Sequence, residues 1–143
     1  MTIPARLGIV TLGVADLDRS AAFYEALGWE RCSSSSDAIV WFRTADTYIG
    51  LFPWEELAAD AALPPEPRAR FGGITLAINV EEAEDVGRAL AAAVAADGSL
   101  LKAAVVTDWG ATSGYFADPD GHPWEIAYNP DFTLDAEGRV RIP

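Results

Sequence analysis

The sequence predicts an α+β fold made of two successive βαβββ modules. The apolar segment 74–78 repeats the pattern of segment 10–14, with an offset of 64 residues from Thr11 to Thr75. Each of these segments is followed by an apolar stripe at helical spacing and then by short runs typical of strands. We assign residues 5–53 to module one, 54–70 to a linker, 71–130 to module two and 131–143 to a C-terminal tail.

Module one begins with an apolar run at 7–14, which predicts a buried strand. Asp16 then offers a helix N-cap, and Gly28 stands where a left-handed C-terminal cap is expected. The apolar residues between them follow helical spacing: Leu17, Ala21, Tyr24 and Leu27. Segments 29–32, 38–43 and 48–53 predict three further strands, with turns at 33–36 and 44–46.

The linker is rich in alanine and then in proline, with a single helical turn expected at 55–59. In module two we expect a strand at 74–78, a helix at 82–96 and strands at 100–106, 115–117 and 124–128. The core stripe of the helix is Val86, Leu90, Ala93 and Val94. The tail predicts a small hairpin over 132–142, with its turn near Gly138.

Composition limits the classes of function. With 143 residues, half of them hydrophobic, the chain is sized for one domain with a sizeable core. Its net charge of −12 argues against nucleic acid, which requires a basic surface. We expect neither a membrane-spanning run nor a secretory leader, and the lone Cys32 excludes an internal disulfide. We therefore expect a cytoplasmic protein with no nucleic-acid or membrane partner.

The most informative segment is a hairpin centred on residues 118–121. Asp118, Pro119 and Gly121 meet the requirements of a type I turn, and apolar residues flank the turn on both sides. In the following strand Trp124 and Ile126 share one face, while Glu125 lies on the other. Glu125 is a lone carboxylate in an apolar strand, which makes it the first candidate for chemistry.

Three stretches together resemble the vicinal oxygen chelate superfamily, which includes glyoxalase I, extradiol dioxygenases and bleomycin-resistance proteins. They are segments 11–17, 20–29 and 118–125. The resemblance implies that the two modules form one cupped, barrel-like mixed sheet, with a metal held between them in the enzymes. It also implies a homodimer.

The resemblance places the four metal-ligand positions on Ile9, Gly50, Gly73 and Glu125. Only Glu125 has a donor side chain, whereas a divalent ion requires several N, O or S donors. His122 precedes Glu125 by three residues, so the period of two puts it on the opposite face. We therefore expect no metal and no cofactor, with Gly50 and Gly73 vacating the space that a metal and its ligands fill.

Side chains alternate between the two faces of a strand, so counting in steps of two from the four metal-ligand positions identifies the residues that line the cup. Its candidate ligand-binding residues are Thr11, Tyr48, Phe52, Thr75 and Glu125. The side chains on the other face of these strands are bulkier and suit packing against helices, as at Leu12, Leu76 and Ile126. A concave and largely apolar wall with few polar groups is suited to a small organic ligand.

The leading interpretation is metal-independent binding of a small organic molecule. The excess of acidic over basic residues favours a cationic or amphipathic ligand. Glu125 is then a charge partner for the ligand, or a general acid or base. In a purely structural role, Glu125 instead pairs with Arg43 or Arg6.

Two rival functions fit the same residues. One is an enzyme, either a metal-free lyase or isomerase that uses Glu125, or a divergent glyoxalase or dioxygenase. The second is an interaction subunit with a vestigial pocket. Whether Trp41, Trp54, Trp109 and Tyr115 belong to the core, a lid or a ligand platform stays open.

Overall fold

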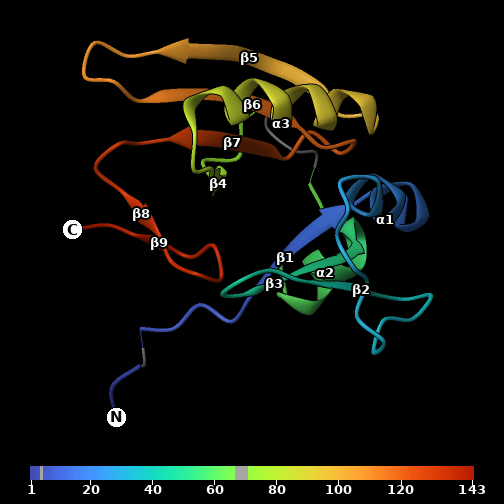
Figure 1. Cartoon of the computed structure of the whole chain (residues 1–143). Helices are drawn as coiled ribbons and strands as arrows, with labels where there is room; N and C mark the ends of the chain where they lie inside the picture. Colours follow the sequence, from blue (N-terminus) through green and yellow to red (C-terminus); the bar gives the residue numbers. More distant parts are fainter. Residues whose placement is uncertain (4, 67–70) are drawn as a thin grey trace.

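The computed structural model describes residues 1–3, 5–66 and 71–143, and it contains two similar modules joined by a linker (Figure 1). Module one holds β1 (Ile9–Val14), α1 (Leu17–Ala26), β2 (Val40–Arg43) and β3 (Tyr48–Pro53), and α2 (Trp54–Asp60) follows. Module two holds β4 (Leu76–Asn79), α3 (Ala83–Ala95), β5 (Ser99–Val106), β6 (Thr112–Ala117) and β7 (Pro123–Tyr128). The tail forms a hairpin of β8 (Thr133–Leu134) and β9 (Val140–Arg141), as predicted.

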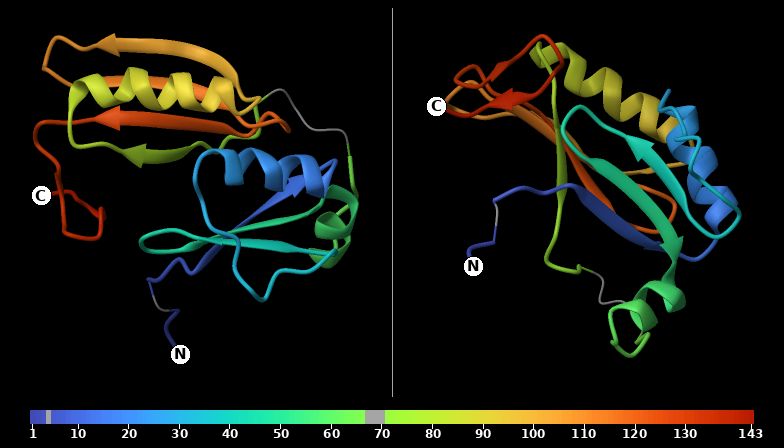
Figure 2. Two further views of the ribbon diagram at one scale, coloured as in Figure 1. Left: turned by 45° about the vertical axis from the view of Figure 1, so that its right-hand side comes forward. Right: turned by 90° about the horizontal axis from the view of Figure 1, so that it is seen from below.

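Both modules use the same strand order, which confirms the predicted α+β fold with two modules. The first sheet runs β1-β3-β2 and the second β4-β7-β6-β5. In each sheet the module's first strand lies parallel to its last strand, and the other pairings are antiparallel. The described strands thus form separate module sheets, and Figure 2 shows the two sheets standing apart with α3 lying across the second.

Some element boundaries differ from the sequence-based expectation. Segment 29–32, expected as a strand, contributes only an isolated bridge from Arg31 to Phe42 at the outer edge of the first sheet, where a strand finds a partner on one side only. The predicted strand at 74–78 begins at Leu76, because Gly73 adopts φ +80° and turns the chain just before it. The single turn expected at 55–59 is the longer helix α2, and linker residues 67–70 lie outside the described residues.

Helix α1 begins and ends where the sequence indicates. The side chain of Asp16 accepts a hydrogen bond from the backbone N–H of Arg19 at 3.0 Å, which satisfies a donor of the first turn. Gly28 follows the helix with φ +89°, a left-handed conformation that glycine adopts at little cost.

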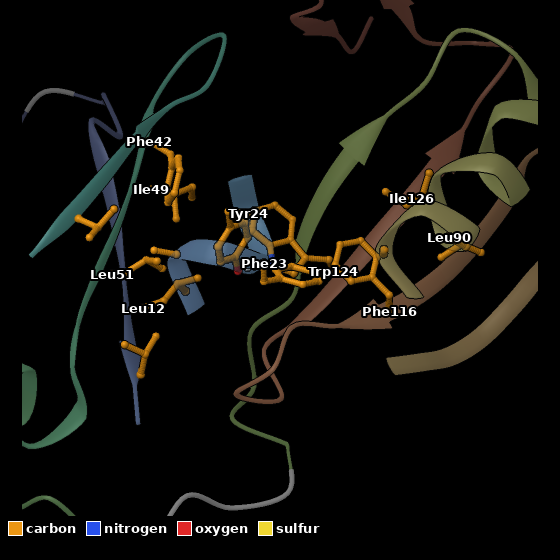
Figure 3. Close-up of a cluster of buried hydrophobic side chains, with 14 of the residues drawn as sticks. Leu12, Phe23, Tyr24, Phe42, Ile49, Leu51, Leu90, Phe116, Trp124 and Ile126 are labelled. Atoms are coloured by element: carbon orange, nitrogen blue, oxygen red, sulfur yellow. Dashed lines mark hydrogen bonds between the residues drawn. The ribbon is translucent and has the colours of Figure 1, made fainter. Parts of the chain in front are cut away.

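The helix-facing sides of the two sheets share one hydrophobic core (Figure 3). Leu12 and Leu51 of the first sheet, and Trp124 and Ile126 of the second, are all buried. Leu76 is half-buried against the same core, so the residues predicted to face the helices do so. In Figure 3, Phe23 and Tyr24 of α1 lie between the side chains of the first sheet and those of the second.

The aromatic side chains of α1 continue directly into module two. Phe23 packs against Phe116 with ring centroids 6.1 Å apart, and Tyr24 meets the edge of Trp124 at the same separation. Phe116 and Trp124 are stacked with their planes 4° apart. Helix α1 therefore covers its own sheet and also holds the second module in place.

A buried hydrogen-bond network ties the β6–β7 turn to module one. The hydroxyl of Tyr24 donates to Oδ2 of Asp118 at 2.7 Å and accepts a hydrogen bond from the indole Nε1 of Trp124 at 3.2 Å. Oδ1 of Asp118 accepts from the backbone N–H groups of Asp120 and His122, which shapes the turn. Burial and then the Asp118 charge raise the pKa of Tyr24 well above its ordinary value, so Tyr24 remains a donor at neutral pH.

Two more contacts from this turn reach the end of β1. Oδ1 of Asp120 accepts from the backbone N–H of Ala15 at 2.8 Å, and Nε2 of His122 lies 2.8 Å from the carbonyl oxygen of Gly13. His122 is buried, so its role in the described structure is to join the modules. At the other end of the molecule, Arg139 of the tail lies 3.7 Å from Asp46 in the β2–β3 turn.

Replacing Ile126 by alanine should lower the free energy of unfolding by about 2–5 kcal/mol, because its side chain is 2% exposed and its loss leaves a cavity. Thr75→Ala, at an exposed position, should change the free energy of unfolding by less than about 0.5 kcal/mol. Urea denaturation of both variants tests the strand parity. If both variants lost the same free energy of unfolding, or Thr75→Ala lost more, the assignment of strand residues to the two faces would be wrong by one residue.

Tyr24→Phe should lower the free energy of unfolding by about 1–3 kcal/mol, because it removes the donor to Asp118 and the acceptor of Trp124 inside the core. Tyr128→Phe is the matched control, since the half-buried Tyr128 forms no side-chain hydrogen bond within the described ranges. Denaturant unfolding at pH 7 compares the two variants. A Tyr24→Phe protein as stable as the control would contradict the proposed importance of this network.

Candidate functional site

A cavity of about 480 Å³ lies at the seam where module one approaches module two. Residues 10–13 of the edge strand β1 form one wall, and Ile74 and Leu76 form the opposite one. Trp54 and Leu57 of α2 close one side, and residues 120–123 of the β6–β7 turn close another. The cavity therefore depends on segments that are far apart in sequence and are brought together by the contacts between modules.

Trp54 owes its place in the cavity wall to a glycine. A Cβ atom at Gly13 would lie 2.7 Å from Cε3 of Trp54, closer than carbon atoms can approach. The absence of a side chain at Gly13 thus allows the indole ring to lie on β1. The roles left open for Trp54 were core, lid and ligand platform, and its place in the cavity wall agrees with a ligand platform.

Two polar side chains that line the cavity, Asp120 and His122, have protein partners. Asp120 accepts from the Ala15 N–H and lies 3.3 Å from the guanidinium of Arg19, and His122 bonds to Gly13. Thr11 also lines the cavity. The remaining lining is mainly aliphatic and aromatic, so the cavity is suited to an apolar group bordered by a few polar atoms.

The five predicted ligand-binding residues do not lie together in one part of the structure. Thr11 lines the seam cavity, and Tyr48 borders two smaller hollows on the open face of the first sheet. Phe52 is half-buried near the end of β3. Thr75 is exposed and precedes β4, so it lies outside the strand that the structure forms, although the predicted strand at 74–78 included it. The structure does not bring Thr11, Tyr48, Thr75 and Glu125 into one shared cavity.

Glu125 lies half-buried on the open face of the second sheet, between Ala77 and Tyr115 on the neighbouring strands. Burial, together with the charge of Glu125 and a hydrogen bond to it, raises the pKa of Tyr115. In the described part of the chain no ion pair joins Glu125 to Arg43 or to Arg6. Tyr115 is therefore the partner of Glu125, and pairing of Glu125 with an arginine receives no support.

The four positions at which the resemblance places metal ligands do not fit a metal. Ile9 is a hydrocarbon side chain and Gly50 and Gly73 have none, which leaves only the carboxylate of Glu125. The described residues contain no group of three or more His, Cys, Asp or Glu side chains that could hold an ion. The donor set of this chain thus lacks what a divalent ion needs.

The expectation that Gly50 leaves empty space is wrong. A Cβ atom at Gly50 would lie 2.5 Å from Cζ3 of Trp41, because the indole ring of Trp41 already covers this glycine. Around Gly73 no described atom lies within 4 Å of the corresponding position. Trp41 therefore fills one of the two places where the sequence indicated a vacancy.

Sequence reasoning did not single out Leu57 or Asp120 for the site. It placed His122 only on the face opposite Glu125, and it left the roles of Trp54 and Tyr115 open. Strand parity tells only which of the two faces of a sheet a side chain occupies. The seam cavity instead lies at the free edge of β1, so residues from both faces of that strand line it. The Tyr115–Glu125 pair had a usable signal. Gly121 in the left-handed conformation extends the type I turn to a three-residue loop, so Asp118 pairs with His122 and counting outward from that pair places Tyr115 opposite Glu125.

Comparison with known proteins agrees with this architecture. Residues 6–126 match the model of the Glyoxalase/Bleomycin resistance protein/Dioxygenase superfamily. The crystal structure of a glyoxalase-related enzyme from Fulvimarina pelagi is 33% identical, with a TM-score of 0.86 over 97% of this chain and 99% of that one. No curated protein matches this chain.

Two more distant structures share the fold. A glyoxalase/bleomycin resistance protein/dioxygenase family enzyme from Burkholderia phytofirmans PsJN is 23% identical, with a TM-score of 0.77 over 87% of this chain and 98% of that one. A lactoylglutathione lyase from Agrobacterium tumefaciens is also 23% identical, with a TM-score of 0.66 over 89% and 96% of the two chains. With the family match over most of its length, the chain belongs to the Glyoxalase/Bleomycin resistance protein/Dioxygenase superfamily.

Proposed function

We propose that this protein binds a small organic molecule in the seam cavity, without the participation of a metal. The observation that carries the proposal is the cavity itself, which has about 480 Å³ of space and a largely apolar wall containing Trp54. Cavities of this size and character accommodate small organic ligands. The metal-ligand positions of the fold offer a single donor side chain, so the protein must hold its ligand by packing and hydrogen bonds.

The lining indicates which part of a ligand enters the cavity. The carboxylate of Asp120 is balanced by Arg19 and the Ala15 N–H, so an apolar or aromatic group is favoured inside. The net charge of −12 attracts cations to the surface and repels anions. An aromatic amine with its ring in the cavity and its ammonium group at the opening satisfies both conditions.

Catalysis by Glu125 is the second candidate function, as a metal-free lyase or isomerase. It is favoured by one observation, the half-buried Glu125 beside Tyr115 without an arginine partner in the described chain. A general base must come within hydrogen-bonding distance of the proton that it removes. Glu125 does not line the seam cavity, so a ligand held there lies away from this carboxylate. The geometry thus favours binding over catalysis.

A homodimer in the cytoplasm completes the proposal. Exposed apolar side chains on the outer strand β5 support association: Leu100, Leu101, Val105 and Val106. Among the described helices none is long and apolar enough to cross a membrane.

The metal part of the proposal predicts that the purified protein carries no stoichiometric divalent ion. Adding nickel, zinc or manganese should leave the melting temperature unchanged, because a lone carboxylate holds such ions weakly. Elemental analysis and melting curves test this, with Glu125→Gln as the control variant. One tightly bound ion per chain that is lost in Glu125→Gln would contradict the proposal.

The binding part is tested with 1-naphthylmethylamine and its neutral analogue 1-naphthalenemethanol, followed by tryptophan fluorescence. Both should bind, and the amine should bind more tightly at low salt because of the net negative charge. Gly13→Ala should weaken both by about tenfold, since the new Cβ displaces the ring of Trp54.

Gly8→Ala is the matched control for this experiment, because a Cβ at Gly8 meets no described atom within 4 Å. It should bind both naphthyl compounds as the unmodified protein does. Failure of both compounds to bind, or equal affinity of the Gly13→Ala and Gly8→Ala variants, would refute the assignment of the seam cavity.

A further inference from the structure

A second hollow lies on the open face of the first sheet and shares no lining residue with the seam cavity. It consists of two adjoining depressions of about 350 and 310 Å³. Cys32, Ser34 and Tyr48 line both depressions, which makes them one continuous hollow. Its two ends differ in chemistry.

One end of this hollow is aromatic and aliphatic. Ile9 and Trp41 line it together with Tyr48. In the sheet register Tyr48 is opposite Ile9, and Trp41 is opposite Gly50, so these side chains stand on one face. The ring of Trp41 lies over Gly50, and Tyr48 and Ile9 remain exposed, 36% and 51% respectively. A flat apolar floor is thus open to a planar group.

The other end of the hollow holds the guanidinium of Arg43. The guanidinium carbon of Arg43 lies 5.6 Å from the centre of the Tyr48 ring. Within the described ranges Arg43 forms no ion pair, whereas the Nε of Arg31 is 3.0 Å from Glu25. Ser33 and Ser34 add hydroxyl donors, and Glu30 contributes one carboxylate. Because Glu25 neutralises Arg31, the group of this hollow that is available to an anion is the guanidinium of Arg43.

We propose that this hollow is a second binding site, for a small aromatic carboxylate. The ring lies on Trp41 and Tyr48, and the carboxylate meets Arg43, whose planar guanidinium matches it in a bidentate arrangement. The volume suits a single-ring acid. A large polyanion is disfavoured by the net charge of −12, so the selectivity is for a small monoanion.

The first test measures the dissociation constant of benzoate by NMR titration, with the indole N–H of Trp41 as the reporter. Arg43→Gln should weaken binding at least about tenfold, because it removes a charge-assisted hydrogen-bonding partner. Arg88→Gln makes the same change of net charge on the far helix α3, where Arg88 pairs with Glu84 and Asp85, and should leave the affinity unchanged. Gly13→Ala, which alters the seam cavity, should also leave it unchanged.

The second test uses Cys32, the only cysteine of the chain, which is half-exposed at the junction of the two ends. Benzoate should slow the alkylation of Cys32 by iodoacetamide, whereas the neutral analogue benzamide should not. The rate is followed by mass spectrometry of the intact protein, and Arg43→Gln should abolish the protection.

The proposal is overturned if millimolar benzoate leaves the Trp41 resonance unchanged, if Arg43→Gln and Arg88→Gln bind benzoate equally, or if benzamide protects Cys32 as well as benzoate does. Loss of naphthylmethylamine binding with intact benzoate binding would refute the seam cavity and leave this second site standing.

Discussion

The arrangement of this molecule depends on a buried hydrogen bond between Tyr24 and Asp118. The described strands pair only within their own modules, so no continuous sheet fixes one module against the other. Their relative position rests on α1, whose aromatic side chains enter the core of module two, and on the turn that Asp118 organises. Because this turn also borders the seam cavity, the same contact that joins the modules sets the shape of the candidate site.

The two modules have the same strand order, yet their open faces differ in chemistry. The first sheet presents Trp41 and Tyr48 with the guanidinium of Arg43 beside them. The second presents Glu125 and Tyr115, followed across the register by Lys102, the only lysine of the chain. An internal repeat fixes the backbone of both halves, while each face is free to take its own side chains. The open faces of the two sheets therefore suit different ligands.

One of the four positions where the resemblance places a metal ligand, Gly50, is covered by an aromatic side chain. Trp41 covers Gly50, and a related contact sets Trp54 on Gly13. In both pairs the indole ring can lie against the backbone because the glycine has no Cβ atom in that space. At Gly50 an aromatic ring thus stands where the resemblance places a metal ligand.

The sequence by itself determined most of the helices and strands, the strand residues that face the helices, and the lack of donor side chains at three of the four metal-ligand positions. Helix caps such as Asp16 and Gly28, the Asp118–Gly121 turn and the alternation around Glu125 are local signals, so they are visible without tertiary contacts. Only the tertiary structure decided that Trp54 and His122 meet β1, that Tyr115 is the partner of Glu125, and that segment 29–32 pairs through one bridge. These contacts join strand edges and side chains distant in sequence, and their geometry follows from how the modules pack against α1 rather than from any local preference.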